Sequence, residues 1–289
     1  MIECMQEFAE LRVIERNAHL IFDNNEGVKL GDSIRKVVVN TANPLYSRIG
    51  AVERQLNCNL KDSLFLGWRL FRKYKANELK EAELFHLKIT SVFEPAGEES
   101  GTLYDEISAC PYCGAGVRQV GPLILNLNRI PKNKDFSRTI AGEIVVSRRV
   151  VDLFNRNEVD NIALTPVIDS RRPQVKSDDW FQLQVISSYG KIISPTLVGN
   201  SPFDYDENDE YRCGAGHLLG LNLLSEVFID MDCQKIPNIF MSKQYVGVRR
   251  GLLRPQNILF VSKRIMNLLK LEKIKGYEIE IARIMNSVL

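Results

Sequence analysis

The sequence predicts an α+β protein: an N-terminal mixed α/β region followed by two duplicated strand-helix-strand lobes, joined by a pair of zinc knuckles. A strand-helix-strand pattern occurs twice, at residues 144–167 and 259–282. A Cys-Gly-Ala-Gly motif also occurs twice, starting at Cys113 and at Cys213. The chain has 289 residues, of which 45% are hydrophobic and 26% charged, a composition typical of folded globular proteins.

The N-terminal region, residues 1–97, has a mixed pattern that indicates no role for its first 75 residues. We expect short strands at 11–14 and 37–39, helices at 64–74 and 77–84, and a half-buried strand at 85–89. The glycine-rich turn at 97–101 follows and marks a domain boundary. The chain is therefore expected to have three parts: residues 1–97, a first repeat lobe at 98–200 and a second at 201–289.

Charge and hydropathy restrict the cellular setting and the partners. The 38 Lys and Arg residues nearly balance the 36 Asp and Glu residues, so the long-range field is weak and nucleic acid is not the favoured partner. The first ten residues, MIECMQEFAE, lack the basic and apolar segments of a signal peptide, and no apolar run reaches membrane-spanning length. We therefore expect a cytoplasmic protein that does not enter membranes.

The duplication is read from the apolar pattern rather than from identity. Residues 144–167 align without gaps to 259–282 at an offset of 115, with four identical positions and eleven that pair apolar with apolar. Each segment predicts a short strand, a helix capped by Ser147 or Ser262, and a second strand. The Cys-Gly-Ala-Gly motifs lie at an offset of 100, so the second copy has gained fifteen residues, which we expect to include 246–255.

Two cysteine turns carry the predicted chemistry. Cys110-Pro-Tyr-Cys113-Gly has the two-residue spacing that brings two thiolates to one point, and Cys213-Gly-Ala-Gly-His217 offers a thiolate and an imidazole. Both turns precede a duplicated strand, so a pseudo-twofold relation between the lobes would bring them together. The sequence predicts one structural Zn²⁺ site with the ligands Cys110, Cys113, Cys213 and His217.

Other interpretations of these residues remain open. The cysteines could be unmetallated buried thiols with His217 on the surface, and Cys233 could replace His217 as a ligand. A redox pair is disfavoured because no strand immediately precedes Cys110, and a catalytic zinc is disfavoured because no acid stands beside His217. Cys58 is expected to be a small buried hydrophobe.

Two charged segments are candidates for a partner surface, although each is also typical of a solvated loop or hairpin tip. Acidic side chains could hold a cation or a basic partner: Asp204, Asp206, Glu207, Asp209 and Glu210. Arginines in the extra segment could bind phosphate or carboxylate: Arg249, Arg250 and Arg254.

The chain resembles the bacterial double-CxxCG motif family and, more loosely, the immunity proteins encoded beside polymorphic toxins. The resemblance covers residues 75–289. It rests on Gly101-Thr-x-Tyr-Asp105 before the first knuckle, which is the turn 110–113, and on the second knuckle, which is the turn 213–217. It also rests on the Val-Ser-Arg/Lys-Arg segments at 146–149 and 261–264. The second knuckle departs from the family pattern because it ends in His217. The resemblance implies a non-enzymatic protein that binds a partner protein, most concretely a toxin.

Two other classes of function stay open. A nucleic-acid-binding zinc protein would use the three arginines together with the basic helix starts at Arg148, Arg149, Lys263 and Arg264. An enzyme would need an unrecognised site, since the sequence has no Walker loop, dinucleotide fingerprint, nucleophile elbow or kinase signature.

Overall fold

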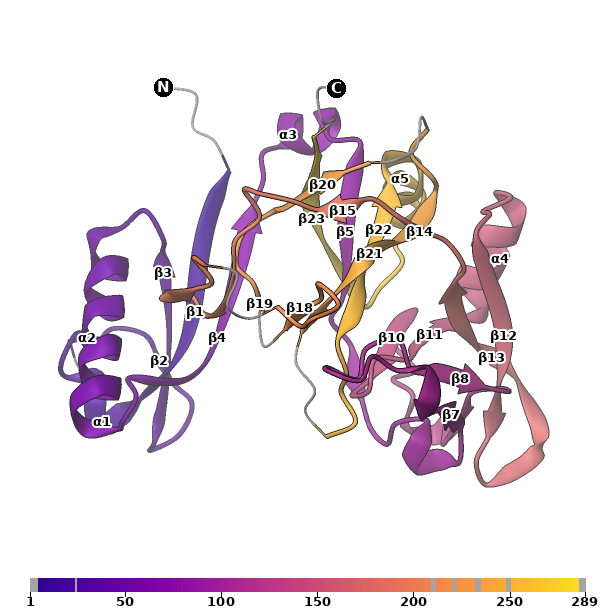
Figure 1. The fold of residues 1–289 in the computed structure, drawn as a ribbon, viewed down its shortest axis with the longest axis horizontal. Helices are drawn as coiled ribbons and strands as arrows, with labels where there is room; N and C mark the ends of the chain where they lie inside the picture. The colour runs from indigo at the N-terminus through magenta and orange to yellow at the C-terminus, as the bar shows by residue number, and fades with distance from the viewer. Residues whose placement is uncertain are drawn as a thin grey trace. The chain divides into compact units, whose positions relative to one another are not determined.

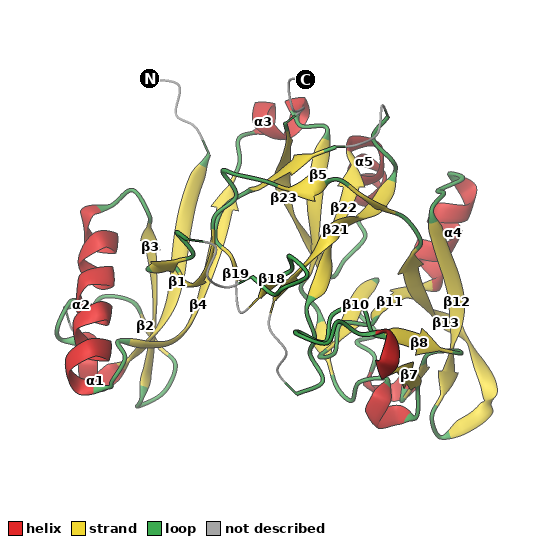
Figure 2. Ribbon diagram, viewed as in Figure 1, coloured by secondary structure: helices red, strands yellow, loops and turns green. Residues whose placement is uncertain are grey.

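A computed structural model of the chain describes residues 5–23, 25–208, 212–219, 222–231, 235–247 and 251–285. The fold is α+β, as predicted, with more strand than helix (Figures 1 and 2). It divides into two compact units. Unit 1 is Met1–Glu81 with Gly199–Tyr205, and unit 2 is Ala82–Val198 with Asp206–Leu289. Among the described residues, no helix is both long and apolar enough to cross a bilayer.

Unit 1 is built on a four-stranded antiparallel sheet with the strand order β2-β3-β1-β4. Its strands are β1 (Gln6–Ile14), β2 (Val28–Lys29), β3 (Ile34–Asn40) and β4 (Phe65–Lys73). The short α1 (Glu15–Ala18) follows β1, α2 (Pro44–Leu60) joins β3 to β4, and α3 (Ala76–Glu81) follows β4. Up to β4 the order is therefore β-α-β-β-α-β, a split βαβ arrangement that leaves one sheet face for helices.

One face of this sheet forms the core of unit 1. Ala9, Leu11 and Val13 alternate along β1 and are fully buried, and α2 lies along the sheet (Figure 1). Asn43 caps the start of this helix with a side chain that accepts the Leu45 N–H, and Pro44 occupies the first helical position.

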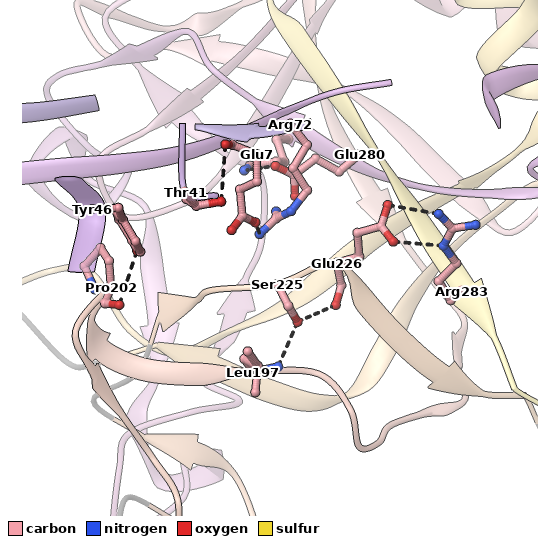
Figure 3. A network of polar contacts seen from close by, with 11 residues as sticks. Glu7, Thr41, Tyr46, Arg72, Leu197, Pro202, Ser225, Glu226, Glu280 and Arg283 are labelled. Carbon is pink, nitrogen blue, oxygen red and sulfur yellow. Dashed lines mark hydrogen bonds and ion pairs between the residues drawn. The ribbon is translucent and has the colours of Figure 1, made fainter. Parts of the chain in front are cut away.

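A hairpin of β16 (Val198–Ser201) and β17 (Asp204–Tyr205) contributes the residues from Gly199 onward to unit 1. The Phe203 ring packs on Tyr46 of α2 and on Phe65 of β4, with ring centroids 4.8 and 6.0 Å apart. The Tyr46 hydroxyl donates to the Pro202 carbonyl (Figure 3). The hairpin is therefore part of the core of unit 1, although it lies far from that unit in sequence.

The helix expected at 64–74 is wrong, because this segment is the strand β4. Its apolar residues do recur at helical spacing, but Leu66 is 68% exposed whereas Leu70 is buried. The backbone pairs with β1 from Gln6 to Val13, so these residues form a sheet edge and not a helix face. Bulky aromatic residues favour such a pleated, half-buried strand.

Unit 2 contains two larger sheets. The first has the order β6-β10-β11-β13-β12-β9, with β6 (Val92–Phe93), β9 (Ile124–Leu125), β10 (Phe136–Thr139), β11 (Ile144–Ser147), β12 (Ile162–Asp169) and β13 (Arg172–Val185). The second has the order β14-β21-β22-β5-β23-β20-β15, with β5 (Leu84–Ile89), β14 (Ser188–Tyr189), β15 (Lys191–Ile192), β20 (Val227–Asp230), β21 (Ile239–Gly247), β22 (Gln256–Ser262) and β23 (Tyr277–Ile284).

Smaller elements complete unit 2. β18 (Leu218–Leu219) pairs with β21, and β7 (Leu103–Asp105) pairs with β8 (Arg118–Val120). The remaining short elements are β19 (Asn222–Leu223) and the 3-10 turns η1 (Glu98–Ser100), η2 (Glu106–Ser108) and η3 (Leu127–Arg129). Glu226, next to β20, is buried and receives two hydrogen bonds from Arg283 of β23, at 2.8 and 3.3 Å (Figure 3).

Both segments expected to fold as strand, helix and strand do so. The first is β11, α4 (Arg148–Arg156) and β12, and the second is β22, α5 (Lys263–Leu271) and β23. The Ser262 hydroxyl accepts the Ile265 N–H, as predicted for an N-cap. Ser147 differs, because its hydroxyl donates to the Asp135 carboxylate at 2.9 Å and makes no cap hydrogen bond.

The division between the units falls after residue 81 and not after residue 97. The strand β5, expected at 85–89, lies between β22 and β23 in the second sheet of unit 2. The residues around the expected boundary at 200 are likewise split, since Gly199–Tyr205 lies in unit 1. Both differences arise from contacts between segments that are far apart in the sequence.

Candidate metal centre

Two short turns of unit 2 position the predicted ligands. Cys110 and Cys113 lie between β7 and β8, and Cys213 and His217 immediately precede β18. In the first turn the Gly114 N–H donates to the Cys110 carbonyl at 2.8 Å, and in the second the Gly216 N–H donates to the Cys213 carbonyl at 2.8 Å. Each turn closes on itself through its own backbone, which fixes the direction of the side chains that it carries.

Glycines are needed for the backbone of these turns. Gly114 and Gly216 have φ values of +72° and +80°, a region that residues with a Cβ seldom adopt. Each glycine lies beside a ligand cysteine or within the loop between two ligands. The repeated Cys-Gly-Ala-Gly motif therefore has a conformational reason as well as a chemical one.

The four predicted ligand residues come together. The ligand atoms of Cys110, Cys113, Cys213 and His217 all lie within 4.8 Å of one another. The Cys113 Sγ is 3.2 Å from the His217 Nδ1. Around a tetrahedral zinc ion with Zn–S bonds of about 2.3 Å and a Zn–N bond of about 2.0 Å, neighbouring donors would lie roughly 3.5 to 3.8 Å apart. The cluster could therefore hold a metal ion with only small side-chain adjustments.

The surroundings of the cluster are apolar and shared between the two turns. Cys113 and Cys213 are buried with Ala115, and Tyr245 packs against this group. The Tyr245 ring meets the His217 imidazole edge to face, with centroids 5.0 Å apart. This packing restricts the imidazole orientation and limits the access of water to the sulfurs.

Tyr112 links the first turn to the second. A Cβ added to Gly214 would lie 3.3 Å from its ring, so the ring lies directly over the Gly214 backbone. Tyr112 nevertheless remains 72% exposed. Neither Tyr112 nor Tyr245 was identified as a site residue from the sequence, because an isolated tyrosine carries no spacing signal.

Without a cation, the thiols of the cluster differ in acidity. Burial raises the pKa of Cys113 to about 11. A backbone hydrogen bond from Tyr112 lowers the pKa of Cys110, and one from Cys113 adds to the effect. Thiolates are the species that bind metal, so metal binding at neutral pH must displace the proton that Cys113 holds in the metal-free protein.

The cysteines of the cluster are free thiols, with no disulfide among the described residues. Cys58, expected to be buried, is instead exposed on α2 and is therefore a surface thiol. Cys233, the proposed substitute for His217, lies outside the described residues.

The acidic candidates do not gather into one site among the described residues. Asp204 is an exposed residue of β17 in unit 1, and Asp206 and Glu207 belong to unit 2. Asp209 and Glu210 lie outside the described residues. The arrangement gives no support to a cation site at this loop.

The arginine candidates are only partly described. Arg249 and Arg250 lie outside the described residues. The Arg254 guanidinium is 13% exposed, forms ion pairs with Glu106 and Glu98, and lies over the Tyr104 ring with Cζ 5.9 Å from the centroid. Arg254 therefore binds carboxylates within its own unit.

Comparison with models of known protein families and with curated proteins finds no match to this chain. The resemblance to the double-CxxCG family therefore stays a prediction.

Proposed function

We propose that this protein is a non-enzymatic scaffold that binds a partner protein, and that one structural zinc ion clasps the two copies of an internal repeat within unit 2. The observation that carries the proposal is the convergence of four ligand atoms within 4.8 Å from two turns about a hundred residues apart. Three thiolates and one imidazole are a donor set that favours zinc, and four protein ligands complete a tetrahedron. Such a closed site stabilises a fold and leaves no position for a substrate.

The strand pairing supports the internal duplication. In the first sheet of unit 2, Phe181 of β13 pairs with Val146 and Pro166. In the second sheet, Phe85 of β5 pairs with Val261 and Ile281. Residues 146 and 166 precede 261 and 281 by the same offset of 115 that aligns the two sequences. The parallel pairs β9 with β12 and β20 with β23 occupy corresponding places in the two sheets.

The same pairing supports an exchange of strands between the copies. If the first copy spans 82–169 and the second 172–284, each begins with a long strand, β5 or β13, and continues with a short one, β6 or β14. Each long strand lies in the sheet of the other copy, whereas each short strand pairs within its own. Neither copy then completes its sheet without a strand of the other copy. The zinc ion would join two copies that are already held together by this exchange of strands.

Exposed apolar side chains beside the first knuckle support the binding of a protein. Leu103 and Val120 are paired across β7 and β8 and are 68% and 46% exposed. Ile107 is 96% exposed and Tyr112 is 72% exposed. We call these four residues the knuckle surface. Exposed apolar groups with an aromatic residue among them are typical of protein interfaces.

Toxin neutralisation is the most concrete form of this function, and it rests on the family resemblance. An immunity protein needs a rigid, complementary surface and no catalytic groups of its own. A metal clasp close to the knuckle surface would supply that rigidity.

The partner proposal is tested by purifying the tagged chain from its native host and by co-expressing it with the recovered partner. We expect a stoichiometric partner whose toxicity is suppressed by the wild type and by Cys58→Ser. Ile107→Asp should lose both binding and protection while keeping its metal. Failure to recover any stoichiometric partner, or full protection by Ile107→Asp, would count against the proposal.

The interlocked clasp is tested by dividing the chain at the turn between β12 and β13. Co-expressed fragments 1–170 and 171–289 should co-purify, and each alone should be insoluble or unfolded, because each lacks a central strand of one sheet. A chelator should weaken the complex. Independent folding of either fragment would contradict the exchange.

The nucleic-acid alternative built on arginines of unit 2 gains no support from their contacts. Arg148 lies over the Phe181 ring, with Cζ 4.4 Å from the centroid, and donates to the Asp178 carbonyl. Arg149 pairs with Asp135, and Arg264 donates to the Asn157 carbonyl. These guanidinium groups already serve the fold.

A further inference from the structure

The second face of the unit 1 sheet is open, and it carries aromatic and basic side chains. Residues on this face alternate with the buried ones and are exposed or half-buried. They include Phe8 and Arg12 on β1, Lys36 on β3, and Arg69, Phe71 and Lys73 on β4. Val38, at 48% exposed, contrasts with its neighbours Val37 and Val39, which are 6% and 5% exposed on the core face. An antiparallel sheet that packs on helices with one face leaves the other available to a ligand.

Two phenylalanines form a stacked pair in this face. Phe8 and Phe71 are direct partners on β1 and β4. Their ring centroids are 5.4 Å apart and their planes differ by 14°. A core role does not account for this pair, because both side chains lie on the face opposite to the buried residues. A nearly parallel stack of two rings can be extended by another flat ring, such as a nucleobase.

Two cations lie beside the aromatic pair, and two more lie farther along the same face. The Lys73 Nζ is 4.7 Å from the Phe8 centroid, and the Arg69 Cζ is 5.8 Å from the Phe71 centroid. Arg12 and Lys36 are partners across β1 and β3 on the same face. Among the described strand residues on this face, four are cations and one is a carboxylate, that of Glu10, which lies opposite Arg69. The net charge of the whole chain is close to zero, so it does not reveal this local positive charge.

We propose that the open face of the unit 1 sheet is a binding platform for single-stranded nucleic acid. Bases would stack on the ring pair, and phosphates would lie along the cations of β1, β3 and β4. Single-stranded nucleic acid combines the two features that the face complements, a regular negative charge and unpaired flat rings. A base that stacks on Phe8 displaces the flexible Lys73 side chain, whose charge can then pair with the neighbouring phosphate.

This platform differs from the protein-binding role proposed above in both location and chemistry. It uses no zinc ligand and no residue of the knuckle surface. An anionic membrane offers negative charge without flat rings, and a duplex buries its bases. Anionic vesicles and duplex nucleic acid should therefore both compete poorly with a single strand for this face.

Fluorescence anisotropy of the full-length protein with a short fluorescein-labelled oligo(dT), at several salt concentrations, tests the proposal. The matching RNA serves as a second probe. With four phosphate contacts on a single strand, log K should fall against log salt with a slope of about −3. Phe71→Ala should weaken binding by roughly 5- to 150-fold, the range for losing one base stack. Phe71→Leu keeps an apolar side chain, and it should weaken binding likewise without lowering stability.

A matched pair of charge reversals separates a specific face from general attraction. Arg12→Glu reverses a cation on the open face, whereas Arg48→Glu reverses an exposed cation on α2. We expect Arg12→Glu to lose most of the binding at moderate salt and Arg48→Glu to bind like the wild type. Equal binding by the two variants, no binding at low salt, or association only with phosphatidylserine vesicles would overturn the proposal.

Discussion

Replacing Gly276 by alanine should disrupt a close contact between two segments of unit 2 that are far apart in the sequence. Gly276 precedes β23, and its φ of +102° lies where residues with a Cβ are strained. A Cβ at this position would lie against the Phe136 carbonyl of β10, far closer than the 3.0 Å that real Cβ atoms respect. The obstacle is backbone and cannot rotate away. The N–H groups of Asp135 and Phe136 both donate to the Lys275 carbonyl, at 3.0 and 2.9 Å.

The size of the effect follows from three contributions. Forcing a left-handed conformation on alanine costs about 1–2 kcal/mol. Pushing two backbone segments apart adds about 1–3 kcal/mol, as in overpacked cores. Weakening the hydrogen bonds around Lys275 adds about 0.5–1.5 kcal/mol for each bond lost. With both hydrogen bonds lost, the total loss in the free energy of unfolding is about 3–8 kcal/mol, a large part of the roughly 5–15 kcal/mol of an ordinary domain.

Urea unfolding followed by circular dichroism measures this loss, and Gly121→Ala is the matched control. Gly121 has a φ of +84° in the same unit, but a Cβ there would meet no heavy atom within 4 Å. The control should therefore lose only the conformational part, about 1–2 kcal/mol. Equal losses in the two variants would refute the close contact between Gly276 and Phe136.

Two further predictions concern unit 1. Gly50→Ala adds helix propensity worth about 1 kcal/mol, but its Cβ would lie 2.6 Å from the Phe203 ring. We expect the substitution to destabilise the wild type and to stabilise a Phe203→Ala variant. A double-mutant cycle measured by thermal unfolding that lacks this change of sign would contradict the packing. Two hydrogen bonds from Arg35, at 2.6 and 3.0 Å, hold the pKa of Glu15 below its ordinary value of 4.5. The wild type should therefore be more stable than Glu15→Gln by the full amount above pH 4.5, and this difference should disappear as the pH falls through the lowered pKa of Glu15. A difference that grows on acidification would exclude the pairing of Glu15 with Arg35.

Local pattern was enough to predict the parts of the fold whose contacts are short in sequence. The apolar faces of α4 and α5 and the strands that flank them repeat with the periods of a helix and a strand, and each segment carries its own signal. The metal cluster was also predictable, because cysteine spacing within each turn reports ligand geometry directly.

The remaining features of the fold depend on contacts between segments that are far apart in the chain, and a single sequence gives no signal for such contacts. The sheet of a strand such as β5 is set by β22 and β23, almost two hundred residues later. The packing of Phe203 on Tyr46 likewise gives no local pattern. At residues 65–73 the apolar spacing fits a helix and the aromatic content fits a strand, and pairing with β1 decided the outcome.

Metal content of the purified protein, measured by inductively coupled plasma mass spectrometry, tests the central claim most directly. We expect one zinc ion per chain in the wild type and in Cys58→Ser, which replaces an exposed cysteine outside the cluster. Cys113→Ser should lose most of its zinc and unfold at lower temperature, because binding of a structural metal is coupled to folding. Equal zinc in Cys113→Ser and Cys58→Ser, or a metal-free wild type of unchanged stability, would contradict the zinc clasp.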